Sequence, residues 1–290
     1  MRLAAALAAL ALVTPAHGEV RVVDDRGVAV TLAAPAQRIV TLAPSLAELA
    51  FAAGAGDRVI GVSTYTDYPK AAARLPVVGS HGRVDVERIV AMRPDLVLAW
   101  QSGNPARDIA RLERLGVPVF VTEPRRLEDI PRILRAIGAL AGVPGSAESA
   151  AAAFAAEARR LGAPPGARPV RVFVEIWHDP LLTVTDAHLI GDLVARCGGE
   201  NVFATAPLLA PQVAREQLLA RDPEVIVSSA GTGDRAEALA LWRDMPSLRA
   251  VREGRVHAVD ARLIHRQGPR ILQAMAAVCA SLAAERAARP

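Results

Sequence analysis

The sequence predicts an α/β fold of two similar lobes, each built on a mainly parallel sheet, joined by one long rigid α-helix. Three features support this prediction. Short apolar strands alternate with amphipathic helices, one helix–proline–strand unit occurs in each half, and an alanine-rich helical segment lies between the halves. The 290 residues are enough for two lobes of ordinary size.

The repeated unit occupies residues 86–98 and 215–227, and its two copies align at one constant offset. In each copy a short helix ends before a proline, which cannot continue it, and a buried apolar strand follows. A unit repeated once per half predicts two lobes of the same design. The offset pairs Glu87 with Glu216, each in the first helical turn, where the helix dipole favours a carboxylate. Two equivalent carboxylates would also offer a partner two matching contact points.

Residues 1–18 are predicted to be a secretory signal peptide. Arg2 supplies the positive end, residues 3–13 form an apolar run too short to span a bilayer, and residues 16–18 provide a cleavage site. No cysteine follows the apolar run, so no lipid attachment is expected. We therefore expect the mature protein to be exported and soluble.

The first lobe is expected over residues 19–143. A capping box at Ser45-Leu46-Ala47-Glu48 predicts the start of a helix that Gly54 ends. A flexible loop is expected at residues 79–82, before the first copy of the repeat. Strands are predicted at residues 38–42, 59–62, 77–78, 96–100 and 117–121, and further helices at residues 106–115 and 127–141.

Residues 144–166 are expected to connect the lobes as one stiff helix. Residues 146–161 have a composition close to ideal for a helix, with acids early and arginines late. The second lobe is then expected over residues 167–290. Strands are predicted at residues 170–176, 225–228 and 256–259, helices at residues 188–196, 235–243 and 270–286, and a loop at residues 261–269.

Composition and motifs argue against a nucleic-acid partner and against an enzyme. The net charge of +4 is not clustered into a basic run, which is typical of a solvated surface. The chain lacks a glycine-rich phosphate loop, a GxSxG elbow and an HExxH motif, so we predict no catalytic residues, no metal site and no cofactor. Cys197 and Cys279 are the only cysteines, and in an exported protein they favour a disulfide over two buried free thiols.

Aromatic, histidine and arginine side chains occur in loops that follow predicted strands. Ligands bind at this edge of parallel α/β sheets, and with two lobes both edges can face one cleft. Simpler roles exist, with Trp100 as core, a loop histidine as a solvated group and Arg266 as a helix cap. Together these side chains favour a cleft for a large, partly flat ligand on which aromatic rings stack. The candidate ligand-binding residues are Tyr65, His81, Trp100, Trp177, His178, His265 and Arg266.

Five segments carry a resemblance to the periplasmic vitamin B12-binding proteins, members of the helical-backbone class of substrate-binding proteins of ABC importers. The segments are RIVTLAPSLAEL at 38–49, GVSTYTDYP at 61–69, VERIVAMRPDLVLAW at 86–100, CGGENVF at 197–203 and PQVAREQLLA at 211–220. The resemblance implies two Rossmann-like lobes, a rigid connecting helix and a corrinoid such as cobalamin bound between the lobes. It also implies a periplasmic location, an importer permease at the inner membrane as partner, no catalysis, and a monomer.

The resemblance also implies roles for individual residues. Tyr65 and Trp100 match aromatic positions of the cobalamin site, and Arg266 matches a cleft arginine. Glu87 and Glu216 match the acidic pair that docks onto the permease. Cys197 and Cys279 match the disulfide of the family.

The sequence departs from that family at part of the aromatic cage. His81 stands where the family has a cleft tryptophan, His265 takes an acidic position, Ala210 lies near a second tryptophan position, and Ile176 beside Trp177 takes a phenylalanine position. We therefore expect at least one of His81, His178 and His265 to approach the metal or the polar side chains of the ligand. Haem or a ferric siderophore is the alternative cargo, and an exported α/β enzyme is the alternative from another class.

Overall fold

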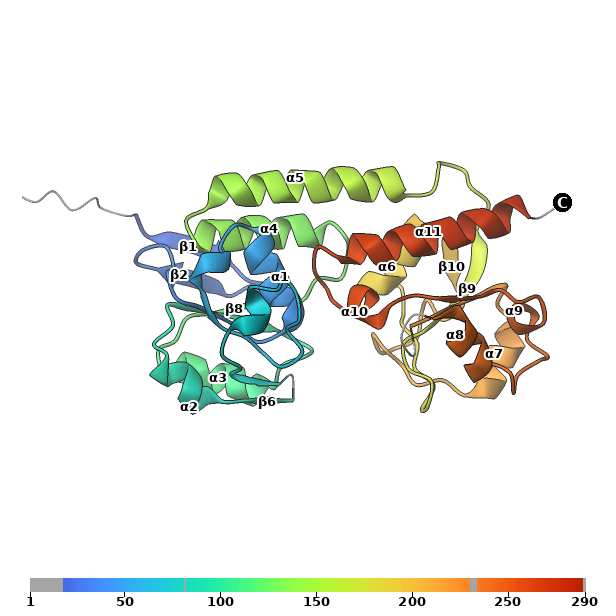
Figure 1. Ribbon diagram of the computed structural model, residues 1–290, viewed down its shortest axis with the longest axis horizontal. Coiled ribbons are helices and arrows are strands. Elements are labelled where there is room, and N and C mark those ends of the chain that lie inside the picture. Colours follow the sequence, from blue (N-terminus) through green and yellow to red (C-terminus); the bar gives the residue numbers. More distant parts are fainter. Residues whose placement is uncertain (1–17, 81, 230–233, 289–290) are drawn as a thin grey trace, which may run out of the picture.

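The computed structural model describes residues 18–80, 82–229 and 234–288 and shows two lobes side by side (Figure 1). Almost all of the predicted signal peptide, residues 1–17, and the candidate ligand residue His81 lie outside the described residues. Among the described residues, no helix combines the length and the apolar character needed to cross a membrane.

The N-terminal lobe is built on a parallel four-stranded sheet in the order β4-β3-β7-β8. Short hairpins, β1–β2 and β5–β6, complete the lobe. Its strands are β1 (Val20–Val23), β2 (Ala29–Leu32), β3 (Ile39–Thr41), β4 (Val59–Gly61), β5 (Gly79–Ser80), β6 (Arg83–Val84), β7 (Leu96–Trp100) and β8 (Val119–Thr122). Its helices are α1 (Pro44–Ala52), α2 (Val86–Ala91), α3 (Ala106–Arg114) and α4 (Asp129–Leu140).

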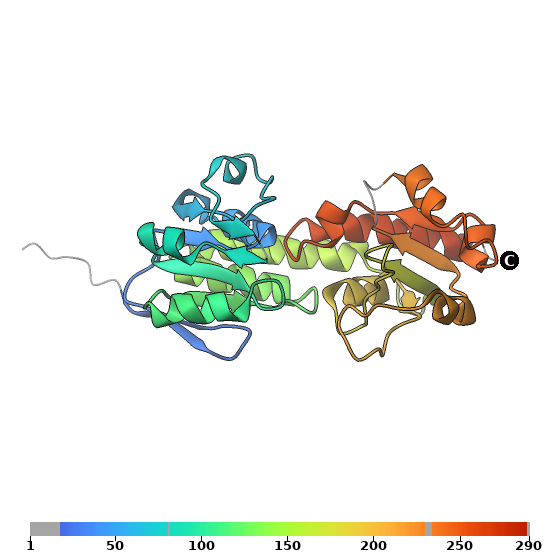
Figure 2. The ribbon, with the colours of Figure 1, turned by 90° about the horizontal axis from the view of Figure 1, so that it is seen from below.

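The C-terminal lobe has a second parallel sheet in the order β10-β9-β11-β12. Figure 2, seen from the face opposite the connecting helix α5 (Pro144–Leu161), shows the sheets of the two lobes next to each other. The strands are β9 (Val170–Glu175), β10 (Gly199–Asn201), β11 (Val225–Ser228) and β12 (Val256–Ala258). The helices are α6 (Leu189–Arg196), α7 (Arg215–Arg221), α8 (Arg235–Leu241), α9 (Arg249–Arg252), α10 (Ala261–Ile264) and α11 (Ile271–Ala287).

The two sheets have the same topology. Within each four-stranded sheet, the strand that comes first in the sequence lies between the second and the third strands. The fourth strand is at the edge, next to the third. The repeated unit of the sequence forms α2 with β7 in one lobe and α7 with β11 in the other, so both copies supply the third strand of the sheet. The predicted α/β fold with two similar lobes is therefore confirmed.

Helix α5 (Pro144–Leu161) runs along both lobes and packs on α4 over the N-terminal lobe and on α11 over the C-terminal lobe (Figure 1). Its 18 residues span about 27 Å at the α-helical rise. The packing on α4 is close because a Cβ at Gly138 would lie 2.1 Å from the Cβ of Ala147. Further along α5, Phe154 and Ala158 are buried in a hydrophobic core that includes residues of both lobes. The helix thus joins the lobes through a shared core.

Three local predictions from the sequence are wrong. Helix α1 begins at Pro44 with Ala43 as the N-cap, so Ser45 lies inside the helix, and the carboxylate of Glu48 binds arginines of the other lobe instead of closing a capping box. Half of the expected loop at residues 79–82 is β5, which pairs with β6. The start of the expected loop at residues 261–269 is α10, capped by the side chain of Asp260.

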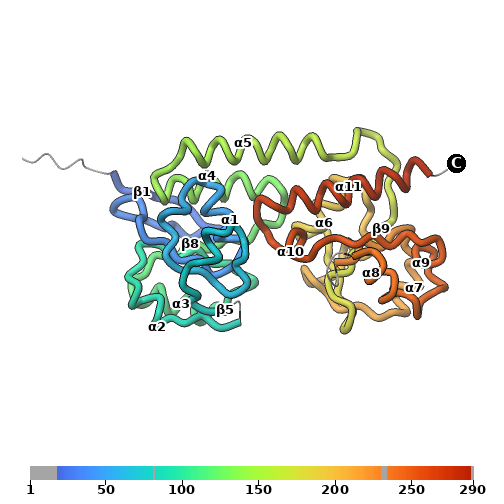
Figure 3. The backbone as a smooth tube through the Cα atoms, viewed as in Figure 1, coloured from blue at the N-terminus to red at the C-terminus, as the bar shows by residue number. Residues whose placement is uncertain are grey.

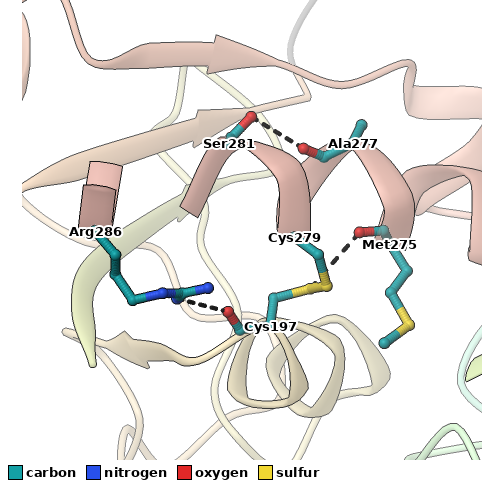
Figure 4. Close-up of a disulfide and its surroundings, with 6 residues drawn as sticks. All are labelled: Cys197, Met275, Ala277, Cys279, Ser281 and Arg286. Carbon is teal, nitrogen blue, oxygen red and sulfur yellow. Dashed lines mark hydrogen bonds between the residues drawn. A yellow bond between two sulfur atoms is a disulfide. The ribbon is translucent and has the colours of Figure 1, made fainter. Parts of the chain in front are cut away.

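Cys197 and Cys279 form the expected disulfide, which links the end of α6 to the middle of α11 (Figure 4). Both cysteines are buried, and the guanidinium of Arg286 donates to the carbonyl oxygen of Cys197 at 3.0 Å. The bond ties together two helices of the C-terminal lobe that are 82 residues apart in sequence. The alternative of two free thiols is thereby excluded.

Replacing both cysteines should destabilise the C-terminal lobe. A bond that closes 82 residues restricts the unfolded chain strongly, so Cys197→Ala with Cys279→Ala should lower the free energy of unfolding by about 4 kcal/mol. Urea unfolding followed by circular dichroism measures this loss. Ser281→Ala is the matched control on the same helix, since its hydroxyl bonds only to Ala277 one turn away. A loss no larger than that of the control would contradict the expected role.

Candidate ligand-binding site between the lobes

A cavity of about 390 Å³ lies between the lobes and is lined by residues of both. Trp100 and Ser102 come from the N-terminal lobe, and the rest of the lining comes from the C-terminal lobe. The polar residues of that second wall are His188, His265 and Gln267. Its other lining residues are Ile176, Trp177, Leu182, Ile190, Leu209 and Ala210.

The cavity lies at the carboxyl edge of both sheets. Trp100 is the last residue of β7, and Trp177 follows the end of β9 by two residues. In each lobe these strands border the point where the strand order reverses, between the first and third strands. Parallel α/β sheets bind ligands at this position, and here two such positions face one space. The expectation of one cleft shared by both edges is met.

The two tryptophans of the cavity are held in different ways. A Cβ at Gly103 would lie 1.8 Å from the ring of Trp100, so only glycine there leaves room for the indole. The indole N–H of Trp100 is buried and has no hydrogen-bond partner. Trp177 is 57% exposed, and its indole N–H donates to the carbonyl oxygen of Asp179 at 2.8 Å. Trp100 thus forms part of the wall, while Trp177 presents an open ring to solvent.

His265 lines the cavity with a fixed hydrogen bond behind it. Its Nε2 lies 2.7 Å from the hydroxyl of Ser229, which follows β11, and that hydroxyl donates to the carbonyl oxygen of Glu175 at 2.8 Å. The ring has an exposed side, yet the protein around it removes enough water to lower the pKa of His265 below its usual value. The imidazole is therefore neutral at pH 7.

His188 also lines the cavity, although the sequence pattern assigned it only to the start of a helix. It is the N-cap of α6, where its Nδ1 accepts a hydrogen bond from the backbone N–H of Ile190 at 3.1 Å. Burial, and then the neighbouring His265, lower the pKa of His188 to about 4. A histidine that precedes a helix is an acceptor for the helix N-terminus, and this was the available signal for its fixed position.

His178 is not among the lining residues of the cavity. Its Nδ1 lies 2.5 Å from a carboxylate oxygen of Glu175, and its ring packs edge-on against Trp242 with centroids 5.5 Å apart. The other oxygen of Glu175 accepts the indole N–H of Trp242 at 2.9 Å. His178 and Trp242 thus satisfy the fully buried carboxylate of Glu175, and the structure does not bring His178 to the lining of the cavity.

Arg266 belongs to an inter-lobe ion cluster, which consists of Glu48, Asp67, Arg266 and Arg270. The guanidinium of Arg266 donates to Glu48 at 3.0 Å and to Asp67 at 2.5 Å, and Arg270 donates to both oxygens of Glu48 at 2.6 and 2.9 Å. The side chain of Glu48 is only 1% exposed. Figure 3 shows α10 and the start of α11 reaching the N-terminal lobe beside α1. Glu48 is on α1, and Arg266 and Arg270 come from the segment between α10 and α11.

The ion cluster also fixes Tyr65. Its carbonyl oxygen accepts a hydrogen bond from Arg266 at 3.0 Å, and its backbone has a φ of 62°, a conformation that costs energy for a residue other than glycine. The ring is 82% exposed and lies outside the cavity lining. The pKa of Asp67 lies below its usual value, and the hydrogen bond from Arg266 is the largest cause of this shift.

A second set of contacts joins the lobes at the start of α4. The backbone N–H of Leu127 donates to the carboxylate of Asp192 on α6 at 2.9 Å. Arg196, also on α6, binds Glu128 and lies 3.1 Å from Asp192. Together with the ion cluster these contacts hold the two walls of the cavity in one arrangement.

Glu87 and Glu216 are exposed, one on each lobe, on α2 and α7, which lie on the side away from α5 (Figure 1). Their surroundings differ. Glu87 lies 2.6 Å from Arg111 of α3, while no ion pair of Glu216 is present within the described residues. The repeat thus places the two carboxylates equivalently, but only one of them is already paired.

Comparison with known proteins assigns the family. Residues 39–263 match the family described as periplasmic binding protein. The chain belongs to the periplasmic binding proteins. It is 36% identical over 251 residues to a vitamin B12-binding protein of Pectobacterium carotovorum, covering 86% of this chain and 89% of that protein.

Two solved structures resemble this periplasmic binding protein closely. A periplasmic vitamin B12-binding protein of Vibrio cholerae is 33% identical with a TM-score of 0.79, covering 88% of this chain and 99% of that chain. The periplasmic haem-binding protein RhuT of Roseiflexus sp. RS-1 is 26% identical with a TM-score of 0.74, covering 86% and 99%. These similarities confirm the resemblance and the fold predicted from the sequence.

Neutralising Glu48 should weaken the contact between the lobes of this binding protein. Glu48→Gln leaves Arg266 and Arg270 facing each other without the buried carboxylate, and breaking such a pair costs about 3 kcal/mol. Thermal unfolding measured by calorimetry should show this loss. The control is Glu157→Gln, which removes an exposed pair with Arg160 on α5 and should leave stability nearly unchanged. Equal effects of the two variants would show that the cluster does not hold the lobes.

The stability should fall in mild acid because of His188. The pKa of His188 lies near 4 in the folded protein and near 6.5 in the unfolded chain, so the unfolded chain binds more protons between these values. The stabilisation from the neutral ring of His188 is complete above about pH 6.5. As the pH falls, the free energy of unfolding decreases, by about 2 kcal/mol between pH 7 and pH 5. His188→Ser keeps a helix cap but no titrating ring, so its urea unfolding should depend less on pH. Identical pH dependence in both proteins would contradict this assignment.

Proposed function

We propose that this protein captures cobalamin or a related corrinoid between its lobes and delivers it to an ABC importer. The observation that carries the proposal is the inter-lobe cavity at the carboxyl edges of both sheets, which is lined by Trp100 and by the exposed ring of Trp177. Relatives of the chain are named vitamin B12-binding proteins. A corrin is a broad, largely flat macrocycle, and aromatic rings at a concave site suit such a shape.

The ligand occupies more than the cavity itself. A corrinoid is larger than 390 Å³, so the cavity takes one edge of the macrocycle and the rest lies in the open space between the lobes. The exposed rings of Trp177 and Tyr65 are available for that part. Arg266 donates a hydrogen bond to the backbone carbonyl of Tyr65. A direct contact between Arg266 and the ligand stays a prediction.

The side chains of the site support binding rather than catalysis. The only serine–histidine contact at the cavity is that of Ser229 with His265, among the described residues. Ser229 is 2% exposed and gives its proton to the backbone carbonyl of Glu175, so His265 does not activate it as a nucleophile. No other group next to the cavity acts as a base toward a nucleophile in the described part of the chain, and we propose that the protein is not an enzyme.

The proposed location is the periplasm, and the proposed partner is the importer permease at the inner membrane. The periplasmic binding protein family and the expected signal peptide at residues 1–18 support this location. We expect the protein to act as a monomer, because both walls of the cavity come from one chain.

Calorimetric titration tests the cargo. Cyanocobalamin and cobinamide should bind with a Kd of micromolar or below, and Trp177→Ala should weaken binding by about tenfold or more because it removes a ring's apolar contact. Trp177→Phe, which keeps a ring, should lose less. No binding of either corrinoid, together with tight binding of haem or a ferric siderophore, would overturn the corrinoid proposal in favour of the cargo named for the Roseiflexus structure or a related chelate.

Charge reversal tests the partner surface. Glu87→Arg and Glu216→Arg should leave corrinoid affinity unchanged and reduce importer-driven uptake several-fold, because rim charges steer and register a partner. Uptake is measured in vesicles containing the reconstituted importer. Glu200→Arg, an exposed glutamate on β10, is the control. Normal uptake with both variants would leave these glutamates with only a helix-dipole role.

A further inference from the structure

The hydrogen bonds around His265 determine where its proton lies. The hydroxyl of Ser229 is 2.8 Å from the carbonyl oxygen of Glu175 and 2.7 Å from Nε2 of His265. A carbonyl oxygen only accepts, so the hydroxyl donates to Glu175 and accepts from His265. In the neutral ring the proton is therefore on Nε2, and Nδ1 of His265 is left with a free lone pair.

His188 has the opposite arrangement. The backbone N–H of Ile190 donates to its Nδ1 at 3.1 Å, and a nitrogen that accepts carries no proton. The neutral ring of His188 therefore has its proton on Nε2. This nitrogen is the remaining polar atom of a side chain that lines the cavity, and it is a donor.

The cavity contains no charged side chain to compete with this pair. Apart from the two histidines, its polar lining residues within the described chain are Ser102 and Gln267, and no arginine, lysine, aspartate or glutamate lines it. Burial lowers the pKa of both histidines, so both are neutral at pH 7. The histidine pair thus offers one N–H donor and one nitrogen acceptor in an uncharged wall.

We propose that His188 and His265 bind a primary carboxamide of the ligand, with Nε2–H of His188 donating to the amide oxygen and Nδ1 of His265 accepting from the amide NH₂ group. This inference rests on the proposed function, because the rim of a corrin carries primary carboxamides. A carboxylate has acceptors only, so it satisfies His188 and leaves Nδ1 of His265 facing a like acceptor, with no arginine or lysine in the described lining of the cavity to bridge them. The pair therefore selects amidated corrinoids over those with a free acid at this position.

The test compares cyanocobalamin with its monocarboxylic acids, in each of which one peripheral amide is hydrolysed. At pH 7.5 one of these acids should bind the wild-type protein about 10- to 100-fold more weakly than cyanocobalamin, because an unpaired buried polar group is costly. In His265→Phe, which removes the acceptor, this ratio should fall below about threefold. His188→Ser keeps the helix cap but removes the donor that the amide and the acid both use, so it should weaken the binding of both and keep the ratio. His257→Gln, which changes a histidine paired with Glu285 outside the cavity, should keep the wild-type ratio.

A cationic variant separates recognition from a loss of folding. His265→Lys should reverse the preference, so that the same acid binds more tightly than cyanocobalamin. Each ratio is measured within one protein, so a general loss of stability does not produce the expected result.

Each of the following results would overturn the inference. Equal binding of all the acids by the wild-type protein, an unchanged ratio in His265→Phe, or an unchanged affinity for cyanocobalamin in His188→Ser removes the carboxamide role while the proposed function stands. A cobalt absorption band that shifts on binding aquocobalamin, and does not shift in His265→Phe, assigns Nδ1 to the metal instead. If cyanocobalamin does not bind at all, the proposed function fails and this inference fails with it.

Discussion

The buried carboxylate of Glu48 is the group on which the arrangement of the two lobes depends. It lies on α1 of one lobe, and its partners Arg266 and Arg270 come from the other, more than 200 residues away in sequence. A carboxylate that is 1% exposed requires both arginines, because its desolvation is otherwise uncompensated. This pairing places the segment with His265 and Gln267 against the N-terminal lobe. The contacts of Asp192 and Arg196 at the opposite side, and the shared core under α5, complete the same constraint.

The site follows from one design used twice. Each lobe presents the carboxyl edge of a sheet with the same strand order, and the arrangement of the lobes turns these edges toward one cavity. The two edges carry different chemistry. The N-terminal edge contributes the tightly held indole of Trp100, while the C-terminal edge contributes the open ring of Trp177 and two neutral imidazoles. An apolar wall thus faces a wall that can make directional hydrogen bonds.

Local pattern in the sequence was enough for the elements and for part of the site. The positions of the prolines and the spacing of the apolar residues identified the repeated unit. The position of Trp100 at the end of an apolar strand identified it as a candidate ligand-binding residue. The partners of Glu48 were out of reach, because a glutamate early in a helix reads as a cap unless its distant arginines are known. His188 was missed as a cavity residue because its position there depends on where the start of α6 lies in the fold. Strand β10 was missed because its three residues are too few to show a period. The contact of His178 with the buried carboxylate of Glu175 was not apparent from the sequence either, because nothing in the pattern showed that Glu175 is buried.

The different surroundings of Glu87 and Glu216 have a consequence for orientation. A carrier with two nearly equivalent lobes can approach a two-fold symmetric partner in either of two poses related by half a turn. Arg111 is paired with Glu87, while no ion pair of Glu216 is present in the part of the chain that the structure describes. The two poses therefore differ in energy only where the partner itself departs from symmetry. On a partner that is not symmetric, the uneven charge of the two lobes favours one of the two orientations. An asymmetric ligand held between the lobes would then be presented to the partner with the same face each time.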